Sequence, residues 1–359
     1  ILDPHGDLAK ELIGYIPRER ADDVIYFDPG DLARPMWLNM LEAANDDEKQ
    51  MLVGDATNIM IKLFGSEIFG PRIQDYFRNG CLTLMDYPQW GAITDLIRLF
   101  TDDNFQRERR TTLKNPIVRS WWDHTYAKMG DREKWEIIPY FAAKFGQFIT
   151  NTMMRNIVGQ TKSAFDIWDV MNQQKLLLVS LSKGTIGDLN SNLLGLILVS
   201  KIQIAAMRRQ NIAKEDRKDF FLYIDEFQNY VTDSIESILS EARKYRLGMV
   251  IAHQYLWQLE KSDALTKSSL NLKWAIFGNV GTVMSYKLGA EDAEFMTKQF
   301  APAFTDQDFV NMDKFKGVMR LMIDGQVSRA FSLIPENIYL DKGDPKLMRA
   351  YMELSRLKY

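Results

Sequence analysis

Two adjacent carboxylates follow a short apolar run near the middle of the sequence. Residues 220–224 are Phe-Phe-Leu-Tyr-Ile, and Asp225 and Glu226 come directly after them. Such a run is typical of a strand buried on both faces of a parallel sheet, and open α/β sheets bind ligands at the carboxyl ends of their strands. In a nucleotide hydrolase, the first carboxylate would hold Mg²⁺ through water and the second would polarise the attacking water. The alternative is that the pair only begins a helix, where carboxylates are favoured.

A polar amide ends the next apolar run along the chain. Residues 249–252 are apolar, and His253 and Gln254 follow them. If this run is a parallel neighbour of the preceding strand, Gln254 would lie beside Asp225 and Glu226, where its amide could hydrogen-bond a γ-phosphate or the attacking water. The alternative is a strand-end glutamine bonded to solvent or to loop backbone. The order of acid pair, helix, strand and glutamine favours the first interpretation.

Basic residues lie at the end of the helical segment between these two strands. Arg243, Lys244 and Arg246 precede Gly248. Cations are favoured at a helix C-terminus and glycine is a common C-cap, so the cluster needs no function. The functional alternative is an arginine supplied to the nucleotide of a neighbouring subunit, where its planar guanidinium would neutralise transition-state charge. Arg243 is the best placed candidate for that role.

The strands that must carry these residues belong to an alternation of strands and helices. The alternation predicts an α/β fold with a doubly wound, mainly parallel sheet of the P-loop type. Residues 317–323 and 327–333 flank Asp324-Gly325-Gln326 and predict an antiparallel hairpin added at a sheet edge. Strands are predicted over residues 1–3, 24–28, 176–182, 220–225, 249–254 and 275–278, with helices over 190–210 and 233–245.

Residues 42–150 differ from the rest because six segments in succession have helical spacing and no clear strand intervenes. We therefore predict an all-α subdomain inserted into the α/β core. The sequence then divides into four parts. These are a first part of a nucleotide-binding core (1–41), the all-α insertion (42–150), a second part of the core (151–334) and a charged, peripheral tail (335–359).

Composition excludes several classes of protein. With 359 residues, 46% of them hydrophobic, and a net charge of −3, the chain is long enough for about two folded domains. The single cysteine, Cys81, excludes an internal disulfide framework and favours a reducing compartment, so we expect a cytoplasmic location. The three histidines lie far apart, which argues against a zinc site. The longest apolar stretch ends at Lys201, well short of the ~20 residues of a membrane helix, so we expect no membrane contact by this segment.

The charge balance does not by itself indicate a nucleic-acid binder, since most such domains have a basic excess. A ring-shaped motor would need positive charge only along its pore. Two basic groups, residues 107–110 and residues 208–218, could contact DNA or a partner, or could be solvated surface. Trp121, Trp122 and Trp135 are expected to pack inside the helical insertion rather than to stack on bases.

The ordered set of motifs resembles the TraG/TraD-type coupling ATPases of type IV secretion and conjugation, in the HerA/FtsK superfamily of hexameric DNA pumps. No single motif carries the likeness, but their order does, from the first residue to about Leu333. The matching motifs are Asp3-Pro4-His5-Gly6-Asp7, Asn39-Met40-Leu41, Gly70-Pro71-Arg72, Leu181-Ser182-Lys183-Gly184, Asp225-Glu226-Phe227-Gln228, Ser240-Glu241-Ala242-Arg243-Lys244, Ala252-His253-Gln254, Gly278-Asn279-Val280-Gly281 and Gly289-Ala290-Glu291-Asp292-Ala293.

The resemblance implies a RecA-like P-loop NTPase motor that uses ATP and Mg²⁺. It implies a homo-oligomeric ring, expected to be a hexamer, around single- or double-stranded DNA, with secretion-system or relaxosome proteins as partners. By this likeness, Asp225 is the Walker B carboxylate associated with magnesium, Glu226 the catalytic base, Gln254 the γ-phosphate sensor and Arg243 the arginine offered across the subunit interface.

The resemblance also places Asp3 and Lys287 near the nucleotide. Relatives commonly have Phe-Arg where Tyr286-Lys287 stands here, and lysine keeps the charge but loses the bidentate fork of arginine.

The main departure from the family is that no Gly-x-x-x-x-Gly-Lys-Ser/Thr sequence occurs in the 359 residues. Gly65-Ser66 and Lys183-Gly184 are no substitute, because neither provides a glycine-rich loop of amides followed by a helix. In the family, this loop lies shortly before the strand that ends in Asp-Pro-His-Gly. We therefore expect the sequence to be a piece that begins after the Walker A loop and is inactive alone. A membrane anchor ahead of it would place the whole protein on the inner face of the cell membrane.

Two other functions stay open. One is a chromosome-processing or DNA-repair translocase of the same superfamily, which sequence upstream of Ile1 would distinguish. The other is a non-enzymatic adaptor that keeps the fold but has lost phosphate binding. An ATPase assay of the whole protein beside its Glu226→Gln variant separates that class from a motor.

Overall fold

The computed structural model describes residues 1–359 except for 90, 232–234, 260–271 and 337–342. The chain divides into two compact units, which are described separately. The first contains Ile1–Ala252 and Gly343–Tyr359, and the second contains His253–Lys342. The boundaries differ from those expected. The second part of the core, predicted over residues 151–334, divides after Ala252, and the last 17 residues, predicted to be a separate tail, belong to the first unit.

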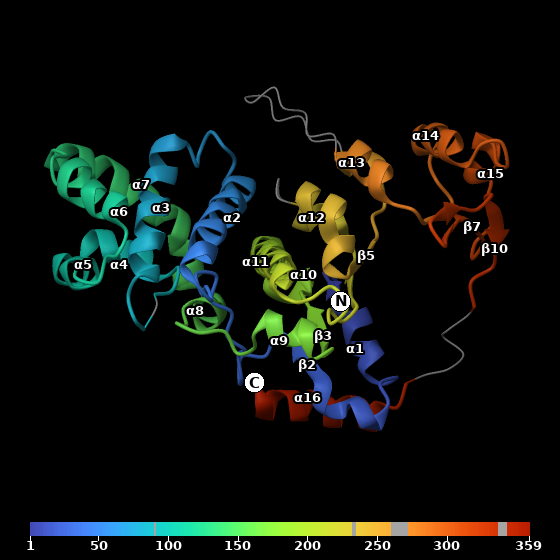
Figure 1. The fold of residues 1–359 in the computed structure, drawn as a ribbon, viewed down its shortest axis with the longest axis horizontal. Helices are drawn as coiled ribbons and strands as arrows, with labels where there is room; N and C mark the ends of the chain where they lie inside the picture. The colour runs from blue at the N-terminus through green and yellow to red at the C-terminus, as the bar shows by residue number, and fades with distance from the viewer. Residues whose placement is uncertain (90, 232–234, 260–271, 337–342) are drawn as a thin grey trace. The chain divides into compact units, whose positions relative to one another are not determined.

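The first unit contains the five-stranded, all-parallel sheet that the sequence predicts for an α/β fold (Figure 1). Leu2 pairs with Val179 on one side and with Ile224 on the other, so the shortest strand lies at the centre. Each strand is hydrogen-bonded to its neighbours in the sheet. Their order is β2 (Val24–Phe27), β3 (Leu176–Ser180), β1 (Leu2–Asp3), β4 (Phe220–Ile224) and β5 (Leu247–Ile251).

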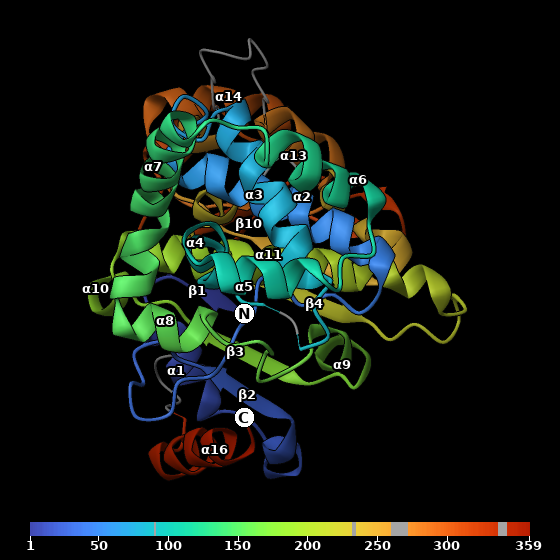
Figure 2. The same cartoon turned by 90° about the vertical axis from the view of Figure 1, so that its left-hand side faces the viewer.

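The C-terminal helix α16 (Pro345–Lys358) covers the β2 edge of this sheet (Figures 1 and 2). Its Tyr351 and Ser355 are buried, and the Ser355 hydroxyl accepts a hydrogen bond from the Tyr26 N–H at 2.9 Å. The expectation of a peripheral tail is therefore wrong. Amphipathic spacing predicts that a helix has a face that packs against the protein, but it does not show which part of the fold that face contacts.

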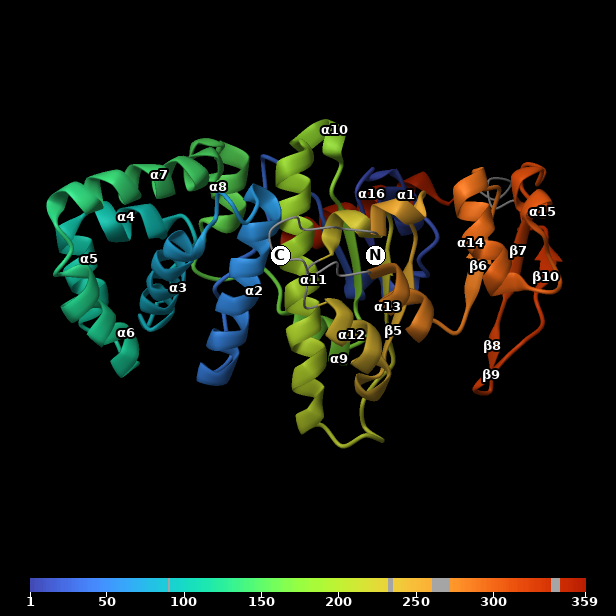
Figure 3. The same cartoon turned by 90° about the horizontal axis from the view of Figure 1, so that it is seen from above.

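Helix α11 (Asp188–Arg208) is the central helix of the first unit and confirms the helix predicted over residues 190–210. It packs against α2 (Asp46–Phe64) and η4 (Phe227–Tyr230), and Figure 3 shows α2 and α11 side by side. The helical span Asp188–Asn211 is long and apolar enough to cross a membrane by length and composition alone, but most of its apolar part is buried inside the fold. A helix that is apolar all round is typical of a core position.

Short helices complete the α/β part of the first unit. The helix predicted over residues 233–245 is present where the chain is described, as α12 and η5. The 3₁₀ segments carry the label η. These elements are α1 (Asp7–Ile13), η1 (Arg18–Asp23), α10 (Lys183–Ile186), η3 (Arg209–Asn211), α12 (Ile235–Glu241) and η5 (Ala242–Tyr245).

Between β2 and β3, the regular elements of the described residues are all helices, as the sequence predicts. Trp121 and Trp122 pack inside this insertion, where Trp122 is fully buried and donates from Nε1 to Thr83 at 2.8 Å. The Trp135 side chain lies outside the described residues. After α2, the helices are α3 (Pro71–Met85), α4 (Asp95–Thr101), α5 (Asp103–Arg110), α6 (Pro116–Ser120), the π-helical η2 (Trp121–Tyr126), α7 (Asp131–Thr150), α8 (Thr152–Val158) and α9 (Ile167–Asn172).

The second unit has its own antiparallel sheet, in the order β10-β7-β6, with the pair β8-β9 beyond it. The predicted hairpin is confirmed by the pairing of β7 with β10 and β8 with β9, but it joins β6 rather than an edge of the parallel sheet. The elements are η6 (Leu256–Leu259), α13 (Leu272–Asn279), β6 (Val283–Ser285), α14 (Ala290–Phe300), α15 (Asp306–Val310), β7 (Gly317–Arg320), β8 (Met322–Ile323), β9 (Gln326–Val327) and β10 (Phe331–Leu333).

The strand predicted over residues 275–278 is instead part of helix α13. The buried residues of this helix, Leu272 and Ile276, are four apart, which is helical spacing. A short apolar run does not distinguish a strand from a buried helix segment, and this one contains a single β-branched residue.

Candidate functional site

The ends of three neighbouring strands meet at one edge of the parallel sheet. Asp3 ends β1 and pairs in register with Ser180, which ends β3. On the other side of β1, the Asp225 N–H donates to the Leu2 carbonyl at 3.1 Å. The acid pair Asp225 and Glu226 therefore follows β4 directly at the carboxyl edge, as predicted from the apolar run.

The Asp3 side chain accepts hydrogen bonds from the turn that follows β1. Its buried carboxylate accepts from the His5 N–H at 2.8 Å and from the Ala9 N–H at 2.9 Å, and so caps the first turn of α1. Gly6 has φ +87°, and a β-carbon there would lie 2.6 Å from the Ser180 hydroxyl oxygen, so the turn requires glycine. These contacts give Asp3 a structural role. A contact with nucleotide stays a prediction.

Asp225 is half-buried and its carboxylate accepts one hydrogen bond, from the Glu226 N–H at 3.0 Å. Burial raises the pKa of Asp225, and the nearby carboxylates of Glu226 and Asp3 raise it further. A divalent cation would relieve this accumulation of negative charge, so the residues fit a Mg²⁺ held through Asp225. Among the described residues, no group of three or more His, Cys, Asp or Glu side chains could hold a metal ion.

Glu226 has an unusual backbone conformation, with φ +48° and ψ +50°. A non-glycine residue in this left-handed region is strained, and such strain clusters at functional sites. Two contacts made by the residues after Glu226 fix this turn. The Phe227 N–H donates to the Ala252 carbonyl beyond β5 at 2.8 Å, and the Gln228 side-chain amide donates to Glu226 Oε2 at 2.5 Å. The sequence analysis missed this contact of Gln228, because a polar residue two positions after Glu226 has no distinctive spacing.

The other predicted site residues lie on exposed surface. Arg243 is exposed in η5 of the first unit, which a contact with another subunit requires. Gln254 and Lys287 are exposed in the second unit, Gln254 near its start and Lys287 two residues after β6. The two units are described separately, so the grouping of Gln254 with the acid pair and the place of Lys287 near a nucleotide stay predictions.

Part of each basic group makes contacts within the first unit. In the first, Arg110 pairs with Asp123 at 2.5 Å, and the Arg109 guanidinium lies 3.5 Å from the centroid of the Tyr87 ring. In the second, Arg209 is fully buried and donates to three backbone carbonyls at 3.1 Å or less. Arg217 also donates to the carbonyls of Ile212 and Lys244. Arg107, Lys214 and Lys218 are exposed, so a contact of either group with DNA or a partner stays a prediction.

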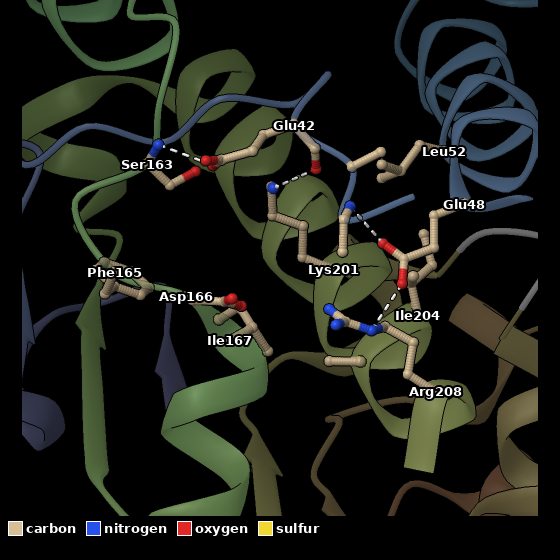
Figure 4. A pocket seen from close by; sticks show the side chains of 13 residues that line it. Glu42, Glu48, Leu52, Ser163, Phe165, Asp166, Ile167, Lys201, Ile204 and Arg208 are labelled. Carbon is tan, nitrogen blue, oxygen red and sulfur yellow. Dashed lines mark hydrogen bonds and ion pairs between the residues drawn. The ribbon is translucent and has the colours of Figure 1, made fainter. Parts of the chain in front are cut away.

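A pocket that the sequence does not predict lies beside α11, where the helical insertion joins the core (Figure 4). Its cavity of about 170 Å³ contains the ammonium group of Lys201, which donates to the Glu42 carbonyl at 3.4 Å, and burial lowers the pKa of Lys201. Glu42 also accepts from the Ser163 N–H. This hydrogen bond joins the segment that enters the helical insertion to the segment that leaves it. None of the predicted site residues lines the pocket.

Comparison with known proteins gives matches only among solved structures. No family model matches the chain, and no curated protein matches it. The unbound bacterial conjugative coupling protein TrwB matches 94% of this chain and 78% of its own, with 13% identity and a TM-score of 0.59. The chain has the fold of a conjugative coupling protein. TrwB structures with the GTP analogue GDPNP and with ADP and Mg²⁺ match the same shares, at 14% identity and a TM-score of 0.56. At this identity, the likeness shows a shared fold.

Proposed function

We propose that the chain is the motor part of an ATP-hydrolysing, DNA-translocating coupling protein of type IV secretion and conjugation. The observation that carries the proposal is the acid pair Asp225 and Glu226 at the carboxyl edge of a parallel sheet with the coupling-protein fold. The solved complexes of TrwB with GDPNP and with ADP and Mg²⁺ support a nucleotide as the ligand of this edge.

In this proposal, the two carboxylates have different tasks. When bound, Mg²⁺ neutralises negative charge on the phosphate oxygens. Asp225, in a cluster of like charges, would hold Mg²⁺ through water with its carboxylate. Glu226 accepts a proton at its carboxylate from the water that attacks the γ-phosphorus. In this proposal, Gln254 orients that water or the γ-phosphate, and Lys287 adds positive charge beside the phosphates.

The exposure of Arg243 supports an oligomeric motor. An exposed guanidinium can reach a neighbouring copy and stabilise charge in that copy's transition state. We propose a cytoplasmic homo-hexamer that encloses DNA and acts with secretion-system or relaxosome proteins. A chromosome-processing translocase would use the same residues, and a non-enzymatic adaptor would use none of them.

Hydrolysis by the gene product that contains this chain tests the proposal. We expect Mg²⁺-dependent ATP hydrolysis that falls by ~100-fold or more in Glu226→Gln, because the variant keeps the shape but loses the proton acceptor. Nucleotide affinity should change little. Glu67→Gln, the same substitution at an exposed position, is the matched control and should keep wild-type activity. If the unmutated gene product does not hydrolyse ATP, the result supports a non-enzymatic adaptor. If the Glu226→Gln variant stays active, Glu226 is not the catalytic base.

A further inference from the structure

The Glu226 carboxylate is held by the side chain of a residue in the same turn. Gln228 Nε2 donates to Glu226 Oε2 at 2.5 Å, and both residues are half-buried. The opposite orientation of the amide would place Gln228 Oε1 against a carboxylate oxygen, so only one orientation is attractive. Gln228 Oε1 is buried and has no hydrogen-bond partner among the described residues. A buried acceptor without a partner is costly, and natural proteins keep such groups mainly where the same side chain has another task.

The backbone of Gln228 is held in turn by the helical insertion. Lys62, near the end of α2, donates from Nζ to the Gln228 carbonyl at 3.2 Å and also to the Val231 carbonyl. The Gln228 carbonyl lies within η4, the turn that follows Glu226 directly, and Val231 is the residue after that turn. A chain of two contacts therefore leads from the first helix of the insertion to the carboxylate, through Lys62 and Gln228.

We infer that Gln228 is a positioning residue for Glu226, and that Lys62 transmits the position of the helical insertion to it. The inference rests on the proposed function, in which Glu226 accepts a proton from the attacking water. A glutamate side chain has three rotatable bonds, and misplacement of a catalytic group by about 1 Å can cost ~100-fold in rate. The hydrogen bond from Gln228 restricts rotation of the Glu226 side chain. A shift of α2 that moves Lys62 away from the Gln228 carbonyl would release this restriction.

Kinetics of two Gln228 variants test the positioning role. In the gene product that contains this chain, Gln228→Ala removes the amide, and Gln228→Glu keeps the size but puts a second carboxylate beside Glu226. We expect kcat for ATP hydrolysis to fall ~10- to 100-fold in both, with KM within about threefold of wild type. A purely structural role would lower the amount of folded enzyme without this split between kcat and KM.

The matched control is Gln74→Ala in α3. Gln74 is also a half-buried glutamine, and its side-chain amide donates to the Phe69 carbonyl at 2.8 Å, so the substitution removes an equivalent hydrogen bond elsewhere in the insertion. Its kcat should stay within twofold of wild type. Thermal unfolding of each variant separates loss of rate from loss of fold.

Two Lys62 variants test the link to the insertion. Lys62→Met keeps the aliphatic stem but removes the donor, and we expect kcat to fall ~3- to 10-fold with little change in KM. Lys62→Arg keeps a donor and should recover most of the rate. The Lys62→Met and Gln228→Ala double variant should be no slower than Gln228→Ala, because the two residues act in series.

The outcomes separate this inference from the function on which it rests. If Glu226→Gln loses activity but Gln228→Ala and Gln228→Glu, both folded, keep kcat within twofold of wild type, the positioning role is overturned and the motor proposal stands. Additive losses in the Lys62→Met and Gln228→Ala double variant would overturn the link to the insertion. An inactive parent, or an active Glu226→Gln variant, removes the proposed function itself.

Discussion

The Tyr230 ring occupies the space that a side chain at Gly195 would need. A β-carbon on Gly195 would lie 2.1 Å from Cε1 of this fully buried ring. Gly195 belongs to the central helix α11, and Tyr230 ends η4, the turn after the acid pair. The turn that carries Glu226 and Gln228 therefore rests directly on the core of the unit, and the close approach of helix and ring depends on one glycine.

Gly195→Ala should destabilise the first unit by about 1–3 kcal/mol, because the new methyl group must displace the Tyr230 ring. Gly54→Ala is the matched control, since Gly54 also lies within a helix and a β-carbon added there would meet no atom within 4 Å. That substitution should stabilise by about 0.5–1 kcal/mol through helix propensity. Chemical denaturation measures both. Equal effects of the same sign would show that the ring moves aside without cost.

Arg209→Met should destabilise the fold by about 3 kcal/mol or more. The buried guanidinium donates to the carbonyls of Met171, Lys218 and Tyr245, and the variant would leave these carbonyls without a donor. Arg107→Met, at an exposed position in α5, should change the free energy of unfolding by less than about 0.5 kcal/mol. Urea titrations compare the two. A small effect at Arg209 would mean that water replaces the guanidinium.

Asp225→Asn should make the protein more stable at pH 7 while removing Mg²⁺-dependent activity. Burial raises the pKa of Asp225 above its ordinary value, so the folded state binds the proton more tightly than the unfolded state. The free energy of unfolding therefore falls as pH rises through the folded pKa. We expect a gain in Tm of about 1–3 °C at pH 7 that disappears below the ordinary aspartate pKa of about 3.9.

Asp102→Asn is the control, because its effect on stability at pH 7 should have the opposite sign. Hydrogen bonds from the N–H groups of Phe105 and Asn104 and from the Arg98 side chain hold the pKa of Asp102 below its usual value. Its carboxylate stabilises the fold at neutral pH, and this contribution is lost as pH falls through the folded pKa. This variant should lose stability at pH 7 and little at low pH. Parallel pH profiles for the two variants would contradict the electrostatic explanation of the Asp225 effect.

Cys81 should be unreactive in the native protein. It is fully buried in α3, and burial raises the pKa of its thiol, so both access and thiolate formation are suppressed. We expect a thiol reagent to react ~100-fold more slowly with the native protein than with the unfolded chain. Ser120→Cys adds a thiol at an exposed position and should react at once. Rapid labelling of Cys81 would show that the helical insertion opens easily.

Mixed oligomers test whether Arg243 acts on a neighbouring subunit. Arg243→Ala and Glu226→Gln should each be inactive alone, because one lacks the donated guanidinium and the other the base. When the two are mixed, some interfaces combine an intact Arg243 with an intact Glu226, and activity should partly return. Lys244→Ala, the neighbouring exposed cation, is the control and should stay active alone. Failure of the mixture to recover activity would place Arg243 outside the site.

Strand identity could be predicted where the pattern is strong. The apolar runs that became β2, β3, β4 and β5 are bounded by polar or turn residues, and β2 and β3 are buried as expected of a parallel sheet. The expectation of burial on both faces is wrong for β4 and β5, because Phe221, Tyr223 and Val250 are exposed in this structure. The same pattern misassigned residues 275–278, because a run of four apolar residues fits a buried helix equally well. The placement of Asp225 and Glu226 could also be predicted, because a polar pair directly after an apolar strand lies at the carboxyl end of that strand.

The sequence by itself determined the types of elements and the order of chemical groups along the chain, because periodicity and composition act locally. Only the tertiary structure decided which groups meet. Lys62 could hold the backbone of Gln228, and Arg209 could enter the core, because distant segments supply their partners. The return of α16 to β2 across more than 300 residues has the same cause. Such contacts depend on packing between segments, and a one-dimensional pattern does not contain that information.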